Sequence, residues 1–154
     1  MTNAISLRAA NLADLNTLLQ FEQGIIETEK PLDPFLAAGE LFYYNIPEMI
    51  AAKNIHLIVA VIHEELVASG YLRIENGKHY HKNLKHGYIG FMYVKPSFRG
   101  QRISNVILES LKDWAKKENL KEVRLDVYSN NNGAIKSYER FGFTKGLVNM
   151  KMDI

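Results

Sequence analysis

The sequence predicts an α+β (α/β three-layer) protein, with a mixed, mostly antiparallel central sheet flanked by helices. Three observations support this fold class. Strand-like and helix-like patterns follow one another in the order β-α-α-β-β-β-α-β-α-β. The run 55–62 is apolar on both faces, as expected of a central strand covered on both sides. The chain has 154 residues without linker or repeat, which predicts a single domain over 1–154.

The N-terminal third is expected to contain one strand and two helices. Residues 5–8 have the pattern of a short strand. Asn11 and Asp14 resemble a capping pair that opens a helix. A second helix is predicted over 36–52, with a break near Pro47. The inward positions expected in the first helix are Leu12, Leu15, Leu18 and Leu19.

The remaining elements are predicted from their periodicity. Strands are expected at 55–62, 66–74, 88–94, 123–128 and 150–154. The long helix that begins at Ile103 has one apolar face, formed by Ile103, Val106, Ile107, Leu111, Trp114 and Ala115. A last helix follows Asn131 and ends at Gly142. Only eleven residues follow Phe143, so the chain must close with an abbreviated hairpin.

The segment 94–104 connects an apolar strand to this long helix through a short turn that contains arginine and glycine. Pro96 ends the strand because it has no N–H to donate. A strand, a turn of this kind and a helix together leave free backbone N–H groups at the positive end of a helix dipole. The turn therefore predicts an anion site, with an ordinary crossover turn bearing a surface arginine as the alternative.

A second motif follows about thirty residues later, at 131–143. Asn131 is a good N-cap, and Ala134, Ile135, Tyr138 and Phe141 form one helical face. Together the two segments resemble the GNAT superfamily of acyl-CoA N-acyltransferases over roughly residues 86–146. The family's pyrophosphate signature, Gln/Arg-x-x-Gly-x-Gly/Ala, falls on Arg99, Arg102 and Ser104. Its second signature, Asn-x-x-Ala-x-x-x-Tyr-x-x-x-Gly-Phe, is met by Asn131, Ala134, Tyr138, Gly142 and Phe143.

The resemblance implies acetyl-CoA as co-substrate and a primary amine of a small molecule or protein as acceptor. Arg102 stands where the family usually has glycine, and its guanidinium could pair with a phosphate. Backbone groups of 92–94 would bind pantetheine, and the turn would hold the pyrophosphate. The cofactor-binding residues implied in this way are Met92, Tyr93, Val94, Arg99, Gly100, Gln101, Arg102, Ile103, Ser104, Asn131, Ala134 and Tyr138. The resemblance is also compatible with a homodimer.

Tyr138 is implied to be the catalytic residue, as the acid that protonates the departing CoA thiolate. A backbone N–H near Tyr93 would stabilise the carbonyl oxygen. The alternative for Tyr138 is a core aromatic. Glu27 and Glu29 are candidates for substrate binding, and either of them or Asp126 for the base, against the alternative of solvated surface charges. An alternative function is a non-catalytic acyl-CoA-binding or sensing module with the same fold.

Composition excludes several other classes. A net charge of +2 gives no argument for nucleic acid, and no apolar stretch is long enough to span a membrane. The chain has no cysteine, and no signal peptide is evident, so a cytoplasmic location is expected. No metal is expected. His79 and His81 lie in a histidine-rich loop over 79–86 and could grip a metal only with a third ligand, so a cationic hairpin loop is favoured.

Overall fold

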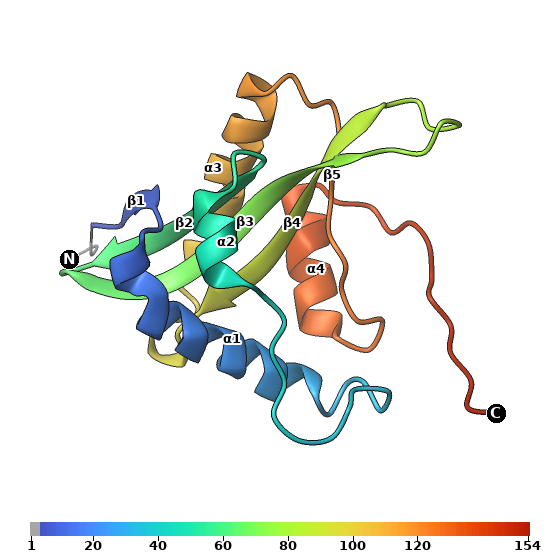
Figure 1. Cartoon of the computed structure of the whole chain (residues 1–154), viewed down its shortest axis with the longest axis horizontal. Helices are drawn as coiled ribbons and strands as arrows, with labels where there is room; N and C mark the ends of the chain where they lie inside the picture. Colours follow the sequence, from blue (N-terminus) through green and yellow to red (C-terminus); the bar gives the residue numbers. More distant parts are fainter. Residues whose placement is uncertain (1–3) are drawn as a thin grey trace.

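The computed structural model describes residues 4–154 and contains one five-stranded sheet in the order β1-β2-β3-β4-β5 (Figure 1). The first four strands are antiparallel neighbours, and β5 pairs with β4 in parallel. This confirms the predicted mixed, mostly antiparallel sheet. The strands are β1 (Ser6–Ala9), β2 (Ile55–Ile62), β3 (Glu65–Asn76), β4 (Lys85–Val94) and β5 (Val123–Arg124).

Helices cover both faces of the sheet (Figure 1). The helices are α1 (Leu15–Glu29), α2 (Ile46–Ala51), α3 (Ile103–Lys117) and α4 (Asn132–Phe141). In β2, Leu57 and Val59 pack with α1 and α2, whereas Ile58 and Ala60 pack with α3. Both faces of this central strand are therefore buried, as its uninterrupted apolar sequence predicts. No helix within residues 4–154 is long and apolar enough to cross a membrane.

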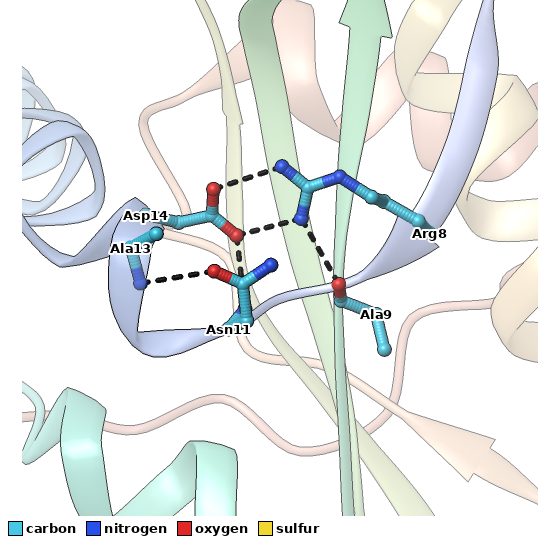
Figure 2. Close-up of polar contacts among 5 residues, drawn as sticks. All are labelled: Arg8, Ala9, Asn11, Ala13 and Asp14. Carbon is cyan, nitrogen blue, oxygen red and sulfur yellow. Dashed lines mark hydrogen bonds and ion pairs between the residues drawn. The ribbon is translucent and has the colours of Figure 1, made fainter.

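The start of α1 is tied to β1 by a polar cluster (Figure 2). The Asn11 side chain accepts the Ala13 N–H at 2.9 Å, and the Asn11 N–H donates to Asp14 at 2.9 Å, which confirms the predicted capping pair. Arg8 donates to both carboxylate oxygens of Asp14, at 2.7 and 2.9 Å. Residues 12–14 form a 3₁₀ turn before the helix, so Leu12 is 65% exposed and its predicted inward position is wrong.

The predicted helix over 36–52 is also wrong, because only Ile46–Ala51 is helical. Asn45 caps this short helix by accepting the Glu48 N–H, and Pro47 lies in its first turn rather than at a break. The preceding segment is irregular because it is held by a side chain from α1. The buried carboxylate of Glu22 accepts the backbone N–H groups of Tyr43 and Tyr44, at 2.9 and 2.7 Å.

Two predicted strands differ at the C-terminal side. The strand expected over 123–128 is paired only at Val123 and Arg124, because β4 and the following residues diverge. The prediction of a closing strand over 150–154 is wrong, because these residues pair with no other strand of the described chain. Residues 144–154 run away from the body as an exposed, extended tail with no strand partner among the described residues (Figure 1).

Candidate active site

The edge of β4 that faces β5 is free over most of its length. The parallel ladder joins Gly87 to Val123 and Tyr88 to Arg124 and stops there. The two segments then separate, and α4 lies beside the opening (Figure 1). Along 89–94, this edge of β4 has no neighbouring strand among the described residues. Such an edge offers N–H and C=O groups to an extended ligand that runs alongside it.

A β-bulge interrupts β4 within this free edge. The register passes from Tyr71 opposite Gly90 to Ser69 opposite Tyr93, so β4 carries one extra residue. Phe91 takes the left-handed conformation, with φ of 53°, and its carbonyl accepts a hydrogen bond from the Ser69 hydroxyl at 2.8 Å. The bulge reorients the backbone of Met92 and Tyr93 relative to the regular ladder. The predicted pantetheine segment, Met92 to Val94, thus lies on the free edge directly after the bulge.

The turn after β4 exposes the N-terminus of α3. A 3₁₀ turn (Pro96–Phe98) is followed by two left-handed residues, Gly100 with φ of 83° and Arg102 with φ of 60°. Arg102 is the N-cap of α3, and no side chain caps the first N–H groups of this helix. Ile103 is buried at 2% exposure and anchors the helix in the core, whereas the turn residues 99–102 are exposed. The N–H groups from Ile103 onward are therefore available to an anion.

Arg99 lies against the end of β4 rather than away from it. Its Nε donates to the Val94 carbonyl at 3.0 Å, and its guanidinium carbon lies 5.8 Å from the centre of the Tyr93 ring. Tyr93 in turn packs against Gly24 and Phe21 of α1. These contacts connect the turn, the bulged strand and α1. They also occupy the carbonyl of Val94, one of the three residues whose backbone groups are predicted to bind pantetheine.

Helix α4 presents Tyr138 to the same region. Asn131 caps this helix by accepting the Ala134 N–H at 3.3 Å, and Gly142 ends it with φ of 127°. Tyr138 is half-buried, and its ring meets Phe143 edge to face at a centroid distance of 5.9 Å. Burial, with a smaller contribution from the charge of Glu29, raises the pKa of the Tyr138 phenol. This hydroxyl therefore keeps its proton at neutral pH.

The last turn of α1 separates the two predicted substrate carboxylates. Glu27 is exposed, whereas Glu29 is half-buried, and its charge raises the pKa of Tyr43 and, to a smaller extent than burial does, that of Tyr138. Burial raises the pKa of Glu29, and the neighbouring charge of Asp33 adds to this effect, while Tyr43 opposes it. A carboxylate in this environment is a stronger base than one in water. The structure therefore brings Glu29 to the site and leaves Glu27 outside it.

Glu29, Asp33, Tyr43 and Tyr128 form what we call the acidic corner. Asp33 accepts the Tyr128 hydroxyl at 2.8 Å and the Phe35 N–H at 2.9 Å, and these bonds lower its pKa. Burial, together with the charge of Glu29, raises the pKa of Tyr43 to about 12. Asp33 is thus committed to hydrogen bonds within the corner, whereas the Glu29 carboxylate interacts with the Tyr43 hydroxyl, which opposes the effect of burial on its pKa. Of the two carboxylates in the corner, Glu29 is the one whose pKa is raised.

An aromatic wall that the sequence analysis missed continues from the acidic corner along the sheet. Tyr44 stacks on Phe91 at 4.4 Å between ring centroids, and Tyr71 and Tyr88 follow at 6.4 Å from each other. Asp126, the third predicted candidate for the base, is exposed and accepts the Tyr88 hydroxyl at 2.9 Å. The available signal was the count of eight tyrosines in the chain, but their assembly depends on the fold.

The histidine-rich hairpin lies at the opposite end of β4 from the turn. His81 Nδ1 accepts the Lys78 N–H at 3.1 Å, whereas His79 packs against Tyr80. A pocket of about 290 Å³ at this end is lined in part by His81, His86 and Asp126. No group of three His, Cys, Asp or Glu side chains within residues 4–154 is arranged to hold a metal ion.

Comparison with solved structures identifies the fold. A mutant of the BH1408 protein from Bacillus halodurans superposes with a TM-score of 0.88 at 19% identity, covering 97% of this chain and 99% of that one. A predicted acetyltransferase from Clostridium acetobutylicum, crystallised with acetyl-CoA, superposes with a TM-score of 0.69, also at 19% identity, covering 97% of this chain and 96% of that one. The chain therefore has the same fold as these proteins.

Sequence comparison identifies the family. A family model described as "Acetyltransferase (GNAT) family" matches residues 17–143, so this chain belongs to the GNAT acetyltransferase family. An N-alpha-acetyltransferase 30 from Dictyostelium discoideum is 30% identical over 130 residues, which are 82% of this chain and 63% of that protein. Its Saccharomyces cerevisiae namesake is 32% identical over 66 residues, 42% and 38% of the two chains. The chain therefore matches less than two thirds of the length of these relatives.

Proposed function

We propose that this protein transfers the acetyl group of acetyl-CoA to a primary amine, with Glu29 and Tyr138 as the base and the acid. The free edge of β4 would bind pantetheine through backbone groups of Met92 and Tyr93. The uncapped N-terminus of α3, with Arg102 beside it, would hold the pyrophosphate. A crossover turn with only a structural role would not need both an uncapped helix and a neighbouring free strand edge.

The observation that carries the proposal is the uncapped N-terminus of α3 next to the bulged edge of β4, which has no neighbouring strand over 89–94 among the described residues. The charge of Glu29 also adds to the raised pKa of the Tyr138 phenol, although the two residues lie far apart in the sequence. Glu29 would accept a proton from the ammonium form of the acceptor, directly or through water, which leaves a neutral amine. The amine nitrogen would attack the thioester carbonyl, forming the C–N bond as the C–S bond breaks. A backbone N–H beside Tyr93 would stabilise the carbonyl oxygen, and Tyr138 would protonate the departing thiolate. The proton that the acetylated nitrogen loses would return to the Tyr138 phenolate, directly or through water.

The acidic corner favours a cationic acceptor. Glu29 and Asp33 supply negative charge, and Tyr43, Tyr128 and the aromatic wall supply flat surfaces suited to an extended chain. An α-amino group at a peptide N-terminus meets these requirements, and the relatives named above are N-alpha-acetyltransferases. We therefore propose a peptide or small cationic amine as acceptor, in preference to an apolar arylamine.

The proposal is tested by measuring CoA release from acetyl-CoA with a panel of peptides and small amines. Tyr138→Phe keeps the ring and removes the hydroxyl, so turnover should fall by about 100-fold or more while acetyl-CoA affinity stays within about twofold. Unchanged turnover in this variant would show that Tyr138 is a core aromatic residue and not the catalytic acid. Binding of acetyl-CoA without CoA release from any amine would instead favour a sensing module.

The role of Glu29 is tested by comparison with Glu27, a nearby exposed residue that receives the same substitution to glutamine as a control. Glu29→Gln should lower kcat/KM for the acceptor by about 10-fold to 100-fold and abolish its acidic pH limb, because the base is lost. Glu27→Gln should match the wild-type protein, and neither change should alter KM for acetyl-CoA. Equal effects of the two substitutions would show a general effect of surface charge and exclude Glu29 as the base.

A further inference from the structure

The pocket of about 290 Å³ at the hairpin end of β4, which we call the hairpin pocket, is not used by the proposed reaction. Two parts of the chain meet in it, namely the hairpin between β3 and β4 and the segment that begins with β5. Its charged and imidazole side chains are Glu75, Lys78, His81, His86, Arg124 and Asp126. So many polar groups in one cavity indicate a polar ligand.

One side chain of the hairpin pocket is buried without a hydrogen-bond partner. His86 is only 6% exposed, and its buried Nδ1 atom forms no hydrogen bond with the described residues. A buried polar atom that lacks a partner costs stability, and folded proteins contain few of them. A ligand atom bound in the pocket would supply the partner that the chain does not.

Both carboxylates of the hairpin pocket already have partners. Glu75 accepts a hydrogen bond from Arg73, with an Nη2–Oε1 distance of 2.9 Å. Asp126 accepts the Tyr88 hydroxyl at 2.9 Å, and this bond ties the pocket to the last ring of the aromatic wall. Because their charge and lone pairs are engaged within the protein, these two carboxylates do not make the pocket a cation site.

The cationic side chains, in contrast, keep donors to spare. Lys78 is exposed and forms no ion pair within the described residues, and its Nζ lies 5.9 Å from the centre of the Tyr80 ring. Arg124 donates through Nε to Glu122, and its Nη2 lies 3.5 Å from the Nδ1 of His81, which leaves Nη1 without a partner among the described residues. Ammonium and guanidinium donors of this kind match the oxygen atoms of a carboxylate. The hairpin pocket is therefore complementary to an anionic group.

The hairpin pocket and the acidic corner are joined by the same short stretch of chain. Asp126 lines the pocket, and Tyr128, two positions later, bonds to Asp33 in the corner. Along β4, Tyr88 of the pocket precedes Met92, beside which the thioester would lie, by four residues. Four strand residues span about 13 Å, at about 3.3 Å each. An extended peptide would cover this distance with about four of its own residues.

We propose that the hairpin pocket binds a carboxylate of the acetyl acceptor, which makes the preferred acceptor a peptide with an acidic residue about four positions from its N-terminus. This inference rests on the proposed function, in which the acceptor amine lies at the acidic corner. The ammonium end of the peptide would meet Glu29, and its carboxylate would meet Lys78, Arg124 and the free nitrogen of His86. Opposite charges at the two ends of the site would fix the direction in which the peptide lies.

Equilibrium binding in the presence of CoA tests this proposal without requiring acetyl transfer. Calorimetry compares alanine peptides with a free N-terminus and an amidated C-terminus. Each carries one glutamate, or one glutamine in the matched peptide, at the third, fourth or fifth position. The glutamate peptide should bind about tenfold more tightly, or better, for at least one position. Equal binding of the matched peptides at all three positions, or no binding of any, would overturn the proposal, whereas selective binding without CoA release from acetyl-CoA would contradict only the proposed function.

Matched charge substitutions show whether the carboxylate lies in the hairpin pocket. Lys78→Gln and Lys82→Gln each remove one lysine from the same hairpin, but Lys82 does not line the pocket. The preference for glutamate over glutamine should fall to about twofold in Lys78→Gln, because a charge-assisted bond is lost. It should keep its wild-type value in Lys82→Gln. Equal losses in the two variants would mean a diffuse attraction by the cationic hairpin and would overturn the proposal.

His86→Leu gives a readout that a purely structural role would not produce. Replacement of an unpartnered buried nitrogen by an apolar group of similar size should leave the free energy of unfolding at or above the wild-type value. The same variant should bind the glutamate peptide about tenfold more weakly, because the pocket loses one of its polar contacts to the carboxylate. A destabilised variant that binds the peptide as the wild type does would show that His86 serves the fold alone, and would contradict its place in the proposed site.

Discussion

Arg102 is one of the non-glycine residues whose backbone takes a left-handed conformation. It caps α3 with φ of 60° and ψ of 25°, a left-handed conformation that glycine adopts at little cost and other residues do not. The GNAT pattern has glycine at this position, so the chain retains the conformation although the residue type has changed. The Arg102 side chain is exposed, and in the proposed function its guanidinium would pair with a phosphate of the cofactor.

Replacement of Arg102 by glycine and by alanine separates its backbone from its side chain. Both variants lose the guanidinium, but only alanine must still adopt the left-handed conformation. We expect Arg102→Gly to be more stable than Arg102→Ala by about 1 kcal/mol in urea unfolding. Both should bind acetyl-CoA more weakly than the wild type and by a similar factor. Equal stability of the two variants would contradict the argument that the left-handed backbone disfavours alanine. Unchanged acetyl-CoA binding would contradict the argument that the Arg102 guanidinium pairs with a phosphate.

Individual site residues differ in how far the sequence predicts them. Tyr138 and Arg102 belong to contiguous motifs, so their positions follow from local spacing. The structure places Arg102 at the N-terminus of α3 and Tyr138 on α4, which lies beside the opening between β4 and β5 (Figure 1). Glu27 and Glu29 point in nearly opposite directions, because positions two apart on a helix differ by about 200°. The sequence does not predict which of the two directions faces the site, because the loop that buries Glu29 is irregular. The bond from Tyr128 to Asp33 joins residues 95 positions apart and leaves no local signal.

At the scale of secondary structure, Glu22 holds the loop between α1 and α2 that carries the acidic corner. Its fully buried carboxylate accepts two backbone N–H groups of the loop. Glu22→Ala would leave these donors buried and unpaired, so we expect a loss of about 2–4 kcal/mol in the free energy of unfolding. The KM for the acceptor should also rise, because Tyr43 and Glu29 lose their support.

The matched control for this loop is Glu27→Ala on the same helix. Glu27 is exposed, and its removal should change stability by less than about 0.5 kcal/mol. Equal stability of the Glu22 and Glu27 variants, measured by chemical unfolding, would show that the loop is held by other contacts.

The contact between Glu22 and the loop explains why most of the helix expected over 36–52 does not form. Its apolar residues have helical spacing, but Glu22 takes up the N–H groups of Tyr43 and Tyr44, which a helix would need for its own ladder. Strands β2, β3 and β4 were predicted more accurately, because their apolar patterns directly reflect which faces of the sheet are buried. The strand after 123 was overestimated because the free edge of β4 depends on strand divergence, which residue patterns do not encode.

At the scale of the whole molecule, the three layers follow from which elements are apolar on one side and which on both. Strand β2 is buried on both faces, and each helix contributes one apolar stripe, so only a sheet between two helical layers satisfies the pattern. The layers are joined by polar contacts as well as by the core. Arg8 in β1 and Asp14 before α1 form such a contact at the edge of the molecule (Figure 2).

This contact makes global stability depend on pH. The hydrogen bonds from Arg8 lower the pKa of the Asp14 carboxyl below that of an unfolded aspartate, about 3.9. A carboxyl whose pKa is lower in the folded state stabilises the fold fully above the unfolded pKa, and this contribution disappears as the pH falls through the folded pKa. Asp14→Asn should therefore cost about 1–2 kcal/mol at pH 7, a value reduced because Arg8 is partly exposed.

Urea unfolding of wild type and Asp14→Asn at pH 7 and in a series of more acidic buffers measures this effect. The difference between the two proteins should shrink steadily below about pH 4, because the wild-type carboxyl becomes protonated and then resembles the amide. Asp113→Asn, at an exposed position on α3, should differ little from wild type at any pH. A constant difference between wild type and Asp14→Asn across the series would mean that the substitution acts through packing or capping geometry, and that the ion pair between β1 and the start of α1 does not set the acid sensitivity of the fold.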